Sequence, residues 1–146
     1  MHPGFTGKIV LGLGLALALG CRPPGLDPKL VTGWLDSKTE PVAMDVSGDW
    51  ESVASYMAGG WGSGAWVQKG NQVTGSLGPY LLDGRVAGNK LYAMIQSGER
   101  IYYTAVLEFT GNGRLAGMAY PKDLADAEHP SLENRAPILL VRPAKP

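Results

Sequence analysis

The stretch SGERIYYTAVLEFTGNGRLAGMAY, residues 97–120, decides the fold that this 146-residue chain predicts. Alternate positions in its first half carry side chains suited to one buried face: Ile101, Tyr103, Ala105, Leu107 and Phe109. A period of two is typical of a β-strand with one face against a core. Gly98 and the Gly-Asn-Gly triplet at 111–113 supply the positive φ angles that tight hairpins need. The stretch therefore predicts two antiparallel hairpins that share the strand at 100–109.

Turn signals of the same kind recur at 69–71 and 87–89, with short alternating runs between them. We expect eight strands, at 47–53, 60–68, 72–78, 80–87, 90–96, 100–109, 114–120 and 137–142. Because a long meander must bury its apolar face, the expected fold is all-β: an eight-stranded antiparallel up-and-down barrel over residues 46–143. The last strand should pair with the first. Helix-forming residues from Lys122 to Glu128 predict a short helix before the last strand.

An apolar run near the N-terminus indicates export. Lys8 precedes an uncharged segment from Ile9 to Leu19, which is shorter than the roughly 20 apolar residues of a membrane-spanning helix. Shortly after it stands Cys21, the single cysteine of the chain. The alternative is an ordinary cleaved signal peptide followed by a free thiol, but an exposed thiol without a disulfide partner is reactive.

The segment Ala18-Leu19-Gly20-Cys21 resembles the lipobox of bacterial lipoprotein signals. The resemblance implies removal of the signal peptide at residues 1–20 and acylation of Cys21, with no other cofactor. Since Arg22 rather than an aspartate follows the cysteine, it also implies an outer-membrane anchor that faces the periplasm. Residues 21–45 then form a lipidated tether. Within it, Asp27 as N-cap and Pro28 as first helical residue predict a short helix that closes one end of the domain.

The start of the predicted barrel resembles that of the lipocalins. Gly48-Asp49-Trp50 is similar to the Gly-x-Trp element that opens their first strand. Arg142 stands in a place comparable to that of the family's arginine near the last strand, which packs over this tryptophan. The family's Thr-Asp-Tyr motif is absent, and residues 110–113 read Thr-Gly-Asn-Gly in its place. The resemblance implies a lipocalin-like architecture.

Charge and residue spacing favour a binding module over an enzyme. Without residues 1–20 the chain has 12 basic and 13 acidic residues, a formal charge of 12 − 13 = −1. No block of like charge remains, so nucleic acid is not an expected partner. We interpret His129 as a solvated loop residue rather than a metal ligand, because no second histidine or cysteine joins it. No serine, carboxylate pair or glycine-rich loop has the spacing of an active site.

The first candidate binding site is the interior of the barrel, which would take a small apolar ligand. Four residues are assigned to it: Trp50, Tyr103, Ala105 and Phe109. If a turn is centred on Gly98, Tyr103 faces Ala93 and Ala105 faces Leu91, so small residues leave space in the middle layer. The alternative is a core filled by the protein's own side chains, with Trp50 plugging one end.

The second candidate is a patch on the outer face, suited to an envelope protein. Six residues on three adjacent strands form it: Tyr92, Met94, Tyr102, Val106, Met118 and Tyr120. Its expected cross-strand pairs include Met94 with Tyr102 and Val106 with Met118. Tyrosine and methionine are enriched at protein contacts, and contiguous apolar patches are usually functional. The alternative is cross-strand pairing that only stabilises the sheet.

Two other functions remain open. Ser97-Gly98-Glu99-Arg100 with Tyr102 is similar, with its spacing changed by one, to a Ser-Gly-x-x-Tyr loop. That loop belongs to small bacterial lipoprotein barrels that inhibit lysozymes. The resemblance implies a periplasmic inhibitor of lysozyme-type enzymes. A purely structural factor in envelope assembly is the other alternative.

Overall fold

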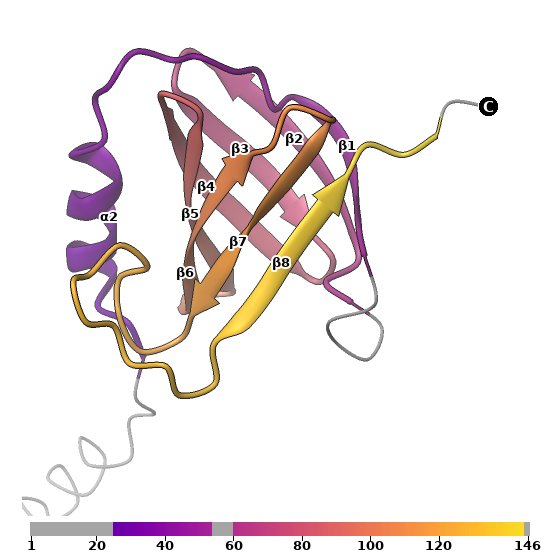
Figure 1. Ribbon diagram of the computed structural model, residues 1–146. Coiled ribbons are helices and arrows are strands. Elements are labelled where there is room, and N and C mark those ends of the chain that lie inside the picture. Colours follow the sequence, from indigo (N-terminus) through magenta and orange to yellow (C-terminus); the bar gives the residue numbers. More distant parts are fainter. Residues whose placement is uncertain (1–24, 54–59, 145–146) are drawn as a thin grey trace, which may run out of the picture.

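Eight strands form a closed antiparallel barrel in chain order (Figure 1). The computed structural model describes residues 25–53 and 60–144, so the predicted signal peptide and Cys21 lie outside the described residues. The strands are β1 Gly48–Ser52, β2 Ser63–Lys69, β3 Gln72–Leu77, β4 Tyr80–Ala87, β5 Lys90–Ser97, β6 Arg100–Phe109, β7 Arg114–Tyr120 and β8 Ala136–Val141. The eight-stranded up-and-down barrel predicted from the sequence is confirmed.

Pairing of β8 with β1 closes the barrel. Glu51 lies opposite Val141 and Ser52 opposite Leu140. One further hydrogen bond continues this seam, because the amide of Val53 donates to the carbonyl of Leu139 at 2.9 Å. Closure removes the unpaired strand edges that an open sheet of this length would expose.

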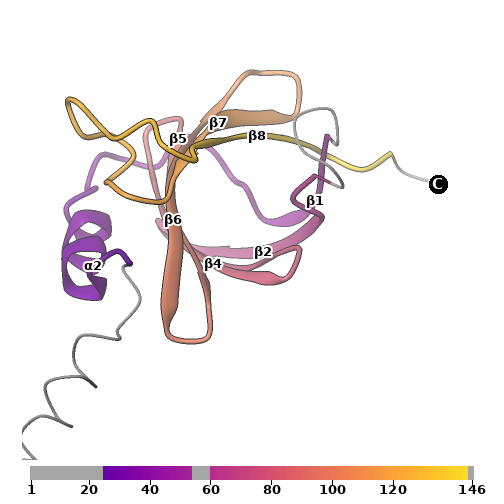
Figure 2. The same cartoon turned by 90° about the horizontal axis from the view of Figure 1, so that it is seen from below.

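A single helix of the described residues, α2 (Pro28–Asp36), precedes the barrel. Its N-terminus is as predicted, since the Asp27 carboxylate accepts a hydrogen bond from the Lys29 amide at 3.0 Å and Pro28 is the first helical residue. Its position differs from the expectation. The buried side chains of Val31, Trp34 and Leu35 face the outer wall at β4 and β5, so α2 lies beside the barrel and not across its end (Figures 1 and 2).

The segment between α2 and β1 is also bound to the barrel. The amide of Gly88 donates to the Pro41 carbonyl at 2.9 Å, and the Ala43 amide donates to the Gly88 carbonyl at 3.0 Å. Val46 is fully buried in the core. From Leu26 onward, the residues expected to form a tether are therefore part of the folded domain.

The connection between β7 and β8, residues 121–135, contains turns and bends but no helix, so the short helix expected over 122–128 is wrong. Polar groups of the connection bond to the barrel and to one another instead. The Thr104 hydroxyl donates to the Asp123 carbonyl at 2.9 Å, and the Asp123 carboxylate accepts from the Ser131 amide. These bonds compete with helical bonds, and the connection lies on the side of the barrel where α2 begins (Figure 1).

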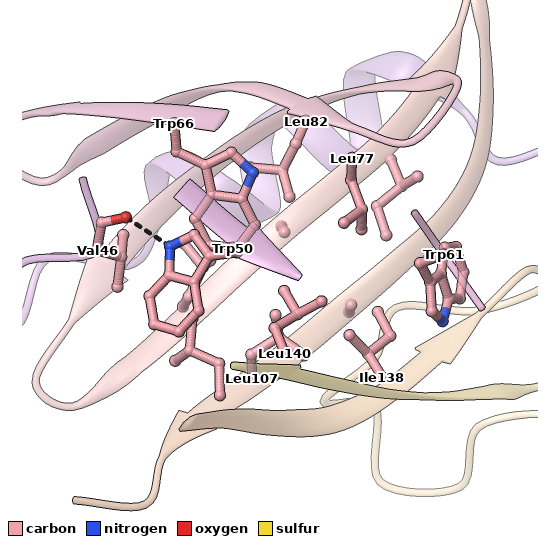
Figure 3. Packing of buried hydrophobic residues seen from close by; sticks show 14 of the residues in the cluster. Val46, Trp50, Trp61, Trp66, Leu77, Leu82, Leu107, Ile138 and Leu140 are labelled. Carbon is pink, nitrogen blue, oxygen red and sulfur yellow. Dashed lines mark hydrogen bonds between the residues drawn. The ribbon is translucent and has the colours of Figure 1, made fainter. Parts of the chain in front are cut away.

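The interior of the barrel is filled by large apolar side chains (Figure 3). Trp50 packs against Trp66 with ring centroids 5.6 Å apart, and its indole nitrogen donates to the Val46 carbonyl at 2.9 Å. Other fully buried members of this cluster include Val73, Leu77, Leu91, Ile95, Leu107, Leu115, Ile138 and Leu140. The structure therefore favours the packed core over a hollow middle layer.

The two-residue turn at 98–99 and a β-bulge between β5 and β6 each shift the predicted pairing by one residue, since Ser97 lies opposite Arg100. Ile95 lies opposite Tyr103, but the next pair is Gln96 with Ile101, so Tyr102 is the extra residue. Along the rest of the pair, Ala105 faces Ala93 and not Leu91, and Met94 faces Thr104 and not Tyr102. The pairs of β6 with β7 match the prediction, including Val106 with Met118.

Candidate functional site

Four aromatic side chains gather at one end of the barrel, and we call them the aromatic rim: Trp61, Tyr80, Tyr102 and Tyr103. The rings of Trp61 and Tyr103 meet edge to face with centroids 5.1 Å apart. The ring centroid of Tyr80 lies 6.0 Å from that of Trp61 and 5.7 Å from that of Tyr102. Residues far apart in the chain meet here because antiparallel strands begin or end at the same edge of the barrel.

Backbone contacts hold Trp61 in this position. Its indole nitrogen donates to the Pro137 carbonyl at 2.9 Å, and its amide donates to the Ser52 hydroxyl at 2.9 Å. Gly78 has a positive φ of 57° and lies against the Trp61 carbonyl, where any Cβ atom would collide with that oxygen. Trp61 thus joins β8 and the β3–β4 turn at this end of the barrel.

Burial, together with the neighbouring Tyr80, raises the pKa of the Tyr103 phenol above its ordinary value of 10.0. The phenol is therefore neutral at physiological pH. It can donate one hydrogen bond and present its ring to an apolar group, but it is not a nucleophile or general base there. A neutral phenol of this kind suits a site that binds a ligand through a hydrogen bond and an apolar contact.

A cleft of about 880 Å³ opens beside the aromatic rim. We call it the rim cleft, and its walls include Arg100, Tyr102, Tyr103, Lys122, Arg135 and Pro137. It lies where the start of β6 extends past the end of β7 and faces the start of β8. Its volume is within the range of about 300–1,000 Å³ that is typical of small-molecule sites.

The described residues that line the rim cleft carry three positive charges and no carboxylate. The guanidinium of Arg100 lies 4.7 Å from the centre of the Tyr102 ring. Lys122 is paired with Glu133, with the ammonium nitrogen and the carboxylate oxygen 2.8 Å apart and both side chains exposed. Apolar ring faces and cationic groups thus meet in one concavity.

The four residues predicted for an interior site do not come together. Trp50 and Ala105 are 1 % and 0 % exposed within the packed core. Tyr103 lies at the aromatic rim, whereas Phe109 lies at the opposite end of β6, about 20 Å away at the usual rise per strand residue. Of the four, Tyr103 lines the rim cleft.

The six residues predicted for an outer patch are also divided. Tyr92, Met94 and Val106 pack in the cluster formed with α2, and the Tyr92 ring meets the Trp34 ring at 5.8 Å. The chain's own helix therefore covers this half of the patch. Met118 and Tyr120 remain half-buried on β7. The outward placement of Tyr102 is wrong, because the bulge turns it toward Tyr80 at the aromatic rim.

The carboxylate of Asp126 fastens α2 to the β7–β8 connection. It accepts a hydrogen bond from the Trp34 indole nitrogen at 2.7 Å and forms an ion pair with Lys38. Burial works against its charge, but the bonds from Lys38 and Trp34 and the charge of Lys38 outweigh it, so the Asp126 pKa lies below its ordinary value. The Lys38 ammonium also lies 4.5 Å from the centre of the Tyr92 ring.

Comparison of the chain with protein-family models, curated proteins and solved structures finds no match. Among the described residues, no helix is long and apolar enough to cross a membrane. Within residues 25–53 and 60–144, no group of three histidine, cysteine or acidic residues is placed to hold a metal ion. The His129 side chain is 91 % exposed in the β7–β8 connection.

Sequence reasoning missed five residues of this site: Trp61, Tyr80, Arg100, Lys122 and Arg135. Each lies close to a predicted turn or to the start or end of a predicted strand, and the alternating strand directions of an up-and-down barrel bring those positions to one edge. The predicted strand order was therefore enough to predict that these residues lie at the same end of the barrel. The bulge that adds Tyr102 to them left no comparable signal.

Proposed function

We propose that this chain is an outer-membrane lipoprotein facing the periplasm, whose barrel is a non-catalytic binding module. The proposed ligand is a small apolar or amphipathic molecule held in the rim cleft. The observation that carries the proposal is the cleft itself: a concavity of about 880 Å³ with Tyr102 and Tyr103 on its wall and cations beside them. The packed core around Trp50 and Ala105 argues against a ligand deeper in the barrel.

The anchor in this proposal rests on the lipobox-like segment and on Cys21. Attachment of more than one acyl chain would hold the protein on a bilayer, since a single chain gives only marginal binding. We expect Cys21→Ser to leave the protein soluble or uncleaved in cell fractionation. A Cys21→Ser variant that stays in the membrane fraction at its processed mass would contradict the anchor.

Native mass spectrometry of protein purified from its own host tests the binding module. We expect an adduct of the mass of one small molecule, and we expect Tyr103→Ala to reduce its occupancy. Phe109→Ala is the matched control, because Phe109 is also half-buried and on the same strand but lies at the far end of the barrel. Equal loss of the adduct in both variants, or no effect of Tyr103→Ala, would contradict a site in the rim cleft.

Inhibition of a lysozyme-type enzyme is the second candidate function. The observation that favours it is the turn from Ser97 to Arg100, where all four residues are exposed at the tip of the β5–β6 hairpin. A lysozyme activity assay with the purified protein separates this candidate from ligand binding. Inhibition that is lost in Ser97→Ala and kept in Tyr103→Ala would favour the inhibitor.

A further inference from the structure

We infer that the rim cleft binds the head group of an anionic membrane lipid. The inference rests on the proposed function and deepens it, because it names the chemical class of the ligand and its source. Three independent features of the aromatic-rim end of the barrel carry it: the charge of the cleft, the kind of aromatic side chains around it and the place where the chain enters the domain.

The charge of the rim cleft selects an anion. Arg100, Lys122 and Arg135 line it, with no Asp or Glu among the described lining residues. The Lys122 ammonium is paired with the Glu133 carboxylate at 2.8 Å. Guanidinium groups bind phosphate oxygens through paired charge-assisted hydrogen bonds, so two arginines on one cleft favour a phosphate-bearing group. The domain as a whole is nearly neutral, so this charge is a local feature.

The aromatic side chains suit a bilayer surface. Tyr80, Tyr102 and Tyr103 are all half-buried, so each presents part of its ring at the end of the barrel. Tyrosine and tryptophan are enriched at the level of lipid head groups, because an apolar ring and a polar atom then each find a matching environment. A cleft with cations and phenol rings side by side matches the phosphate and upper acyl region of one lipid.

The chain enters the domain at this same end. Gly25 lines the rim cleft, and α2 follows directly along the barrel wall (Figure 1). Cys21 precedes Gly25 by four residues, which span at most about 14 Å when fully extended. An acyl anchor on Cys21 would therefore hold the rim cleft within about that distance of the bilayer surface. Mass action then favours a lipid of that membrane over a dilute soluble anion as the occupant.

The experiment uses the acylated protein extracted from membranes in non-ionic detergent, with native mass spectrometry as the readout. Phosphatidylglycerol and phosphatidylcholine with identical acyl chains are added in equal amounts. Both lipids offer the same phosphodiester oxygens, but only phosphatidylcholine adds a choline cation, which the positive charges of the cleft repel. We therefore expect at least about a tenfold preference for phosphatidylglycerol. Arg100→Gln combined with Arg135→Gln should bring the preference close to one. Arg114→Gln, an exposed arginine at the opposite end of the barrel, is the matched control and should leave the preference unchanged.

The outcomes are distinguishable. Equal binding of the two lipids that Tyr103→Ala reduces would overturn the head-group inference and leave the proposed function standing. Binding of neither lipid would overturn the head-group inference, whereas the proposed function would fall only if the protein from its own host also carried no adduct that Tyr103→Ala reduces. Displacement of phosphatidylglycerol by inorganic phosphate would overturn the membrane as the source and assign the cleft to a soluble anion. Displacement by a poly-glutamate peptide, without any lipid preference, would assign it to an acidic protein partner. Circular dichroism of the double variant checks that its fold is unchanged.

Discussion

The guanidinium of Arg142 lies 4.0 Å from the centre of the Trp50 ring, at the end of the barrel opposite the aromatic rim. It also donates to the Ser47 carbonyl at 2.7 Å. Gly48 makes room for it, because a Cβ atom at that position would lie 2.9 Å from the guanidinium and the backbone there has a positive φ of 108°. One side chain after β8 thus caps the core and ties the last strand to the segment before the first.

We expect Arg142→Ala to lower the free energy of unfolding by about 1–2 kcal/mol, through loss of the cation–π contact and the charged hydrogen bond. Urea denaturation followed by tryptophan fluorescence measures it. Arg142→Lys should recover part of the loss, since an ammonium keeps the charge but not the planar stacking. Arg114→Ala, exposed at the same end, serves as control. A loss no larger than that of the control would show that the cap does not stabilise the barrel.

Helix α2 should contribute to stability, because it is packed on the barrel. Leu35 is 1 % exposed beneath the helix, whereas Leu30 on the same helix is 54 % exposed. Leu35→Ala should therefore cost about 2–4 kcal/mol in denaturant unfolding, and Leu30→Ala should stay within about 0.5 kcal/mol. Similar small effects of both variants would show that the helix is a loosely attached tether.

The fold was predictable from the sequence because its signals are local. Alternating residues around Ala105 and Leu107, together with a glycine in each turn, set strand length and order. The contact between Trp50 and Arg142 was expected from their places at the start of the first strand and after the last one. These features depend on spacing along the chain, which a sequence displays directly.

The candidate site was less predictable because it depends on register. The bulge leaves Tyr102 without a partner on β5 and moves its ring from the predicted outer face to the aromatic rim. Turn residues and alternating apolar residues look the same with and without such a bulge, so they do not show which of the two registers forms. The packing of α2 over Tyr92 and Met94 could not be predicted for a different reason. An amphipathic helix shows that it needs an apolar partner surface, but not which wall of the barrel provides it.

The pairing of Asp126 with Lys38 and Trp34 makes part of the stability depend on pH. The folded pKa of Asp126 lies below its ordinary value of 3.8, so this stabilisation is complete above that value and is lost as the pH falls through the lower, folded pKa. Asp126→Asn should cost about 0.5–1 kcal/mol at pH 7, a modest amount since the carboxylate is 36 % exposed.

The measurement for Asp126 is the difference in unfolding free energy between the two proteins at pH 7 and at pH values below 3.8. This difference should shrink at the acidic end. Glu128→Gln is the control, because it removes one carboxylate from the same connection at a side chain that is 91 % exposed. A difference that stays constant with pH would mean that the charge of Asp126 does not matter.

Substitution of Ala105 tests whether the barrel interior is filled. Ala105 is fully buried opposite Ala93 and Ala119, in the layer where the sequence predicted space for a ligand. If that layer is packed, Ala105→Trp forces bulk among fixed neighbours and should cost about 3 kcal/mol in urea unfolding. Val67→Trp is the matched control, since Val67 is 55 % exposed on β2, and it should change stability by less than about 0.5 kcal/mol. Equal stability of the two tryptophan variants would mean that unoccupied volume surrounds Ala105, and the interior would again compete with the rim cleft as the binding site.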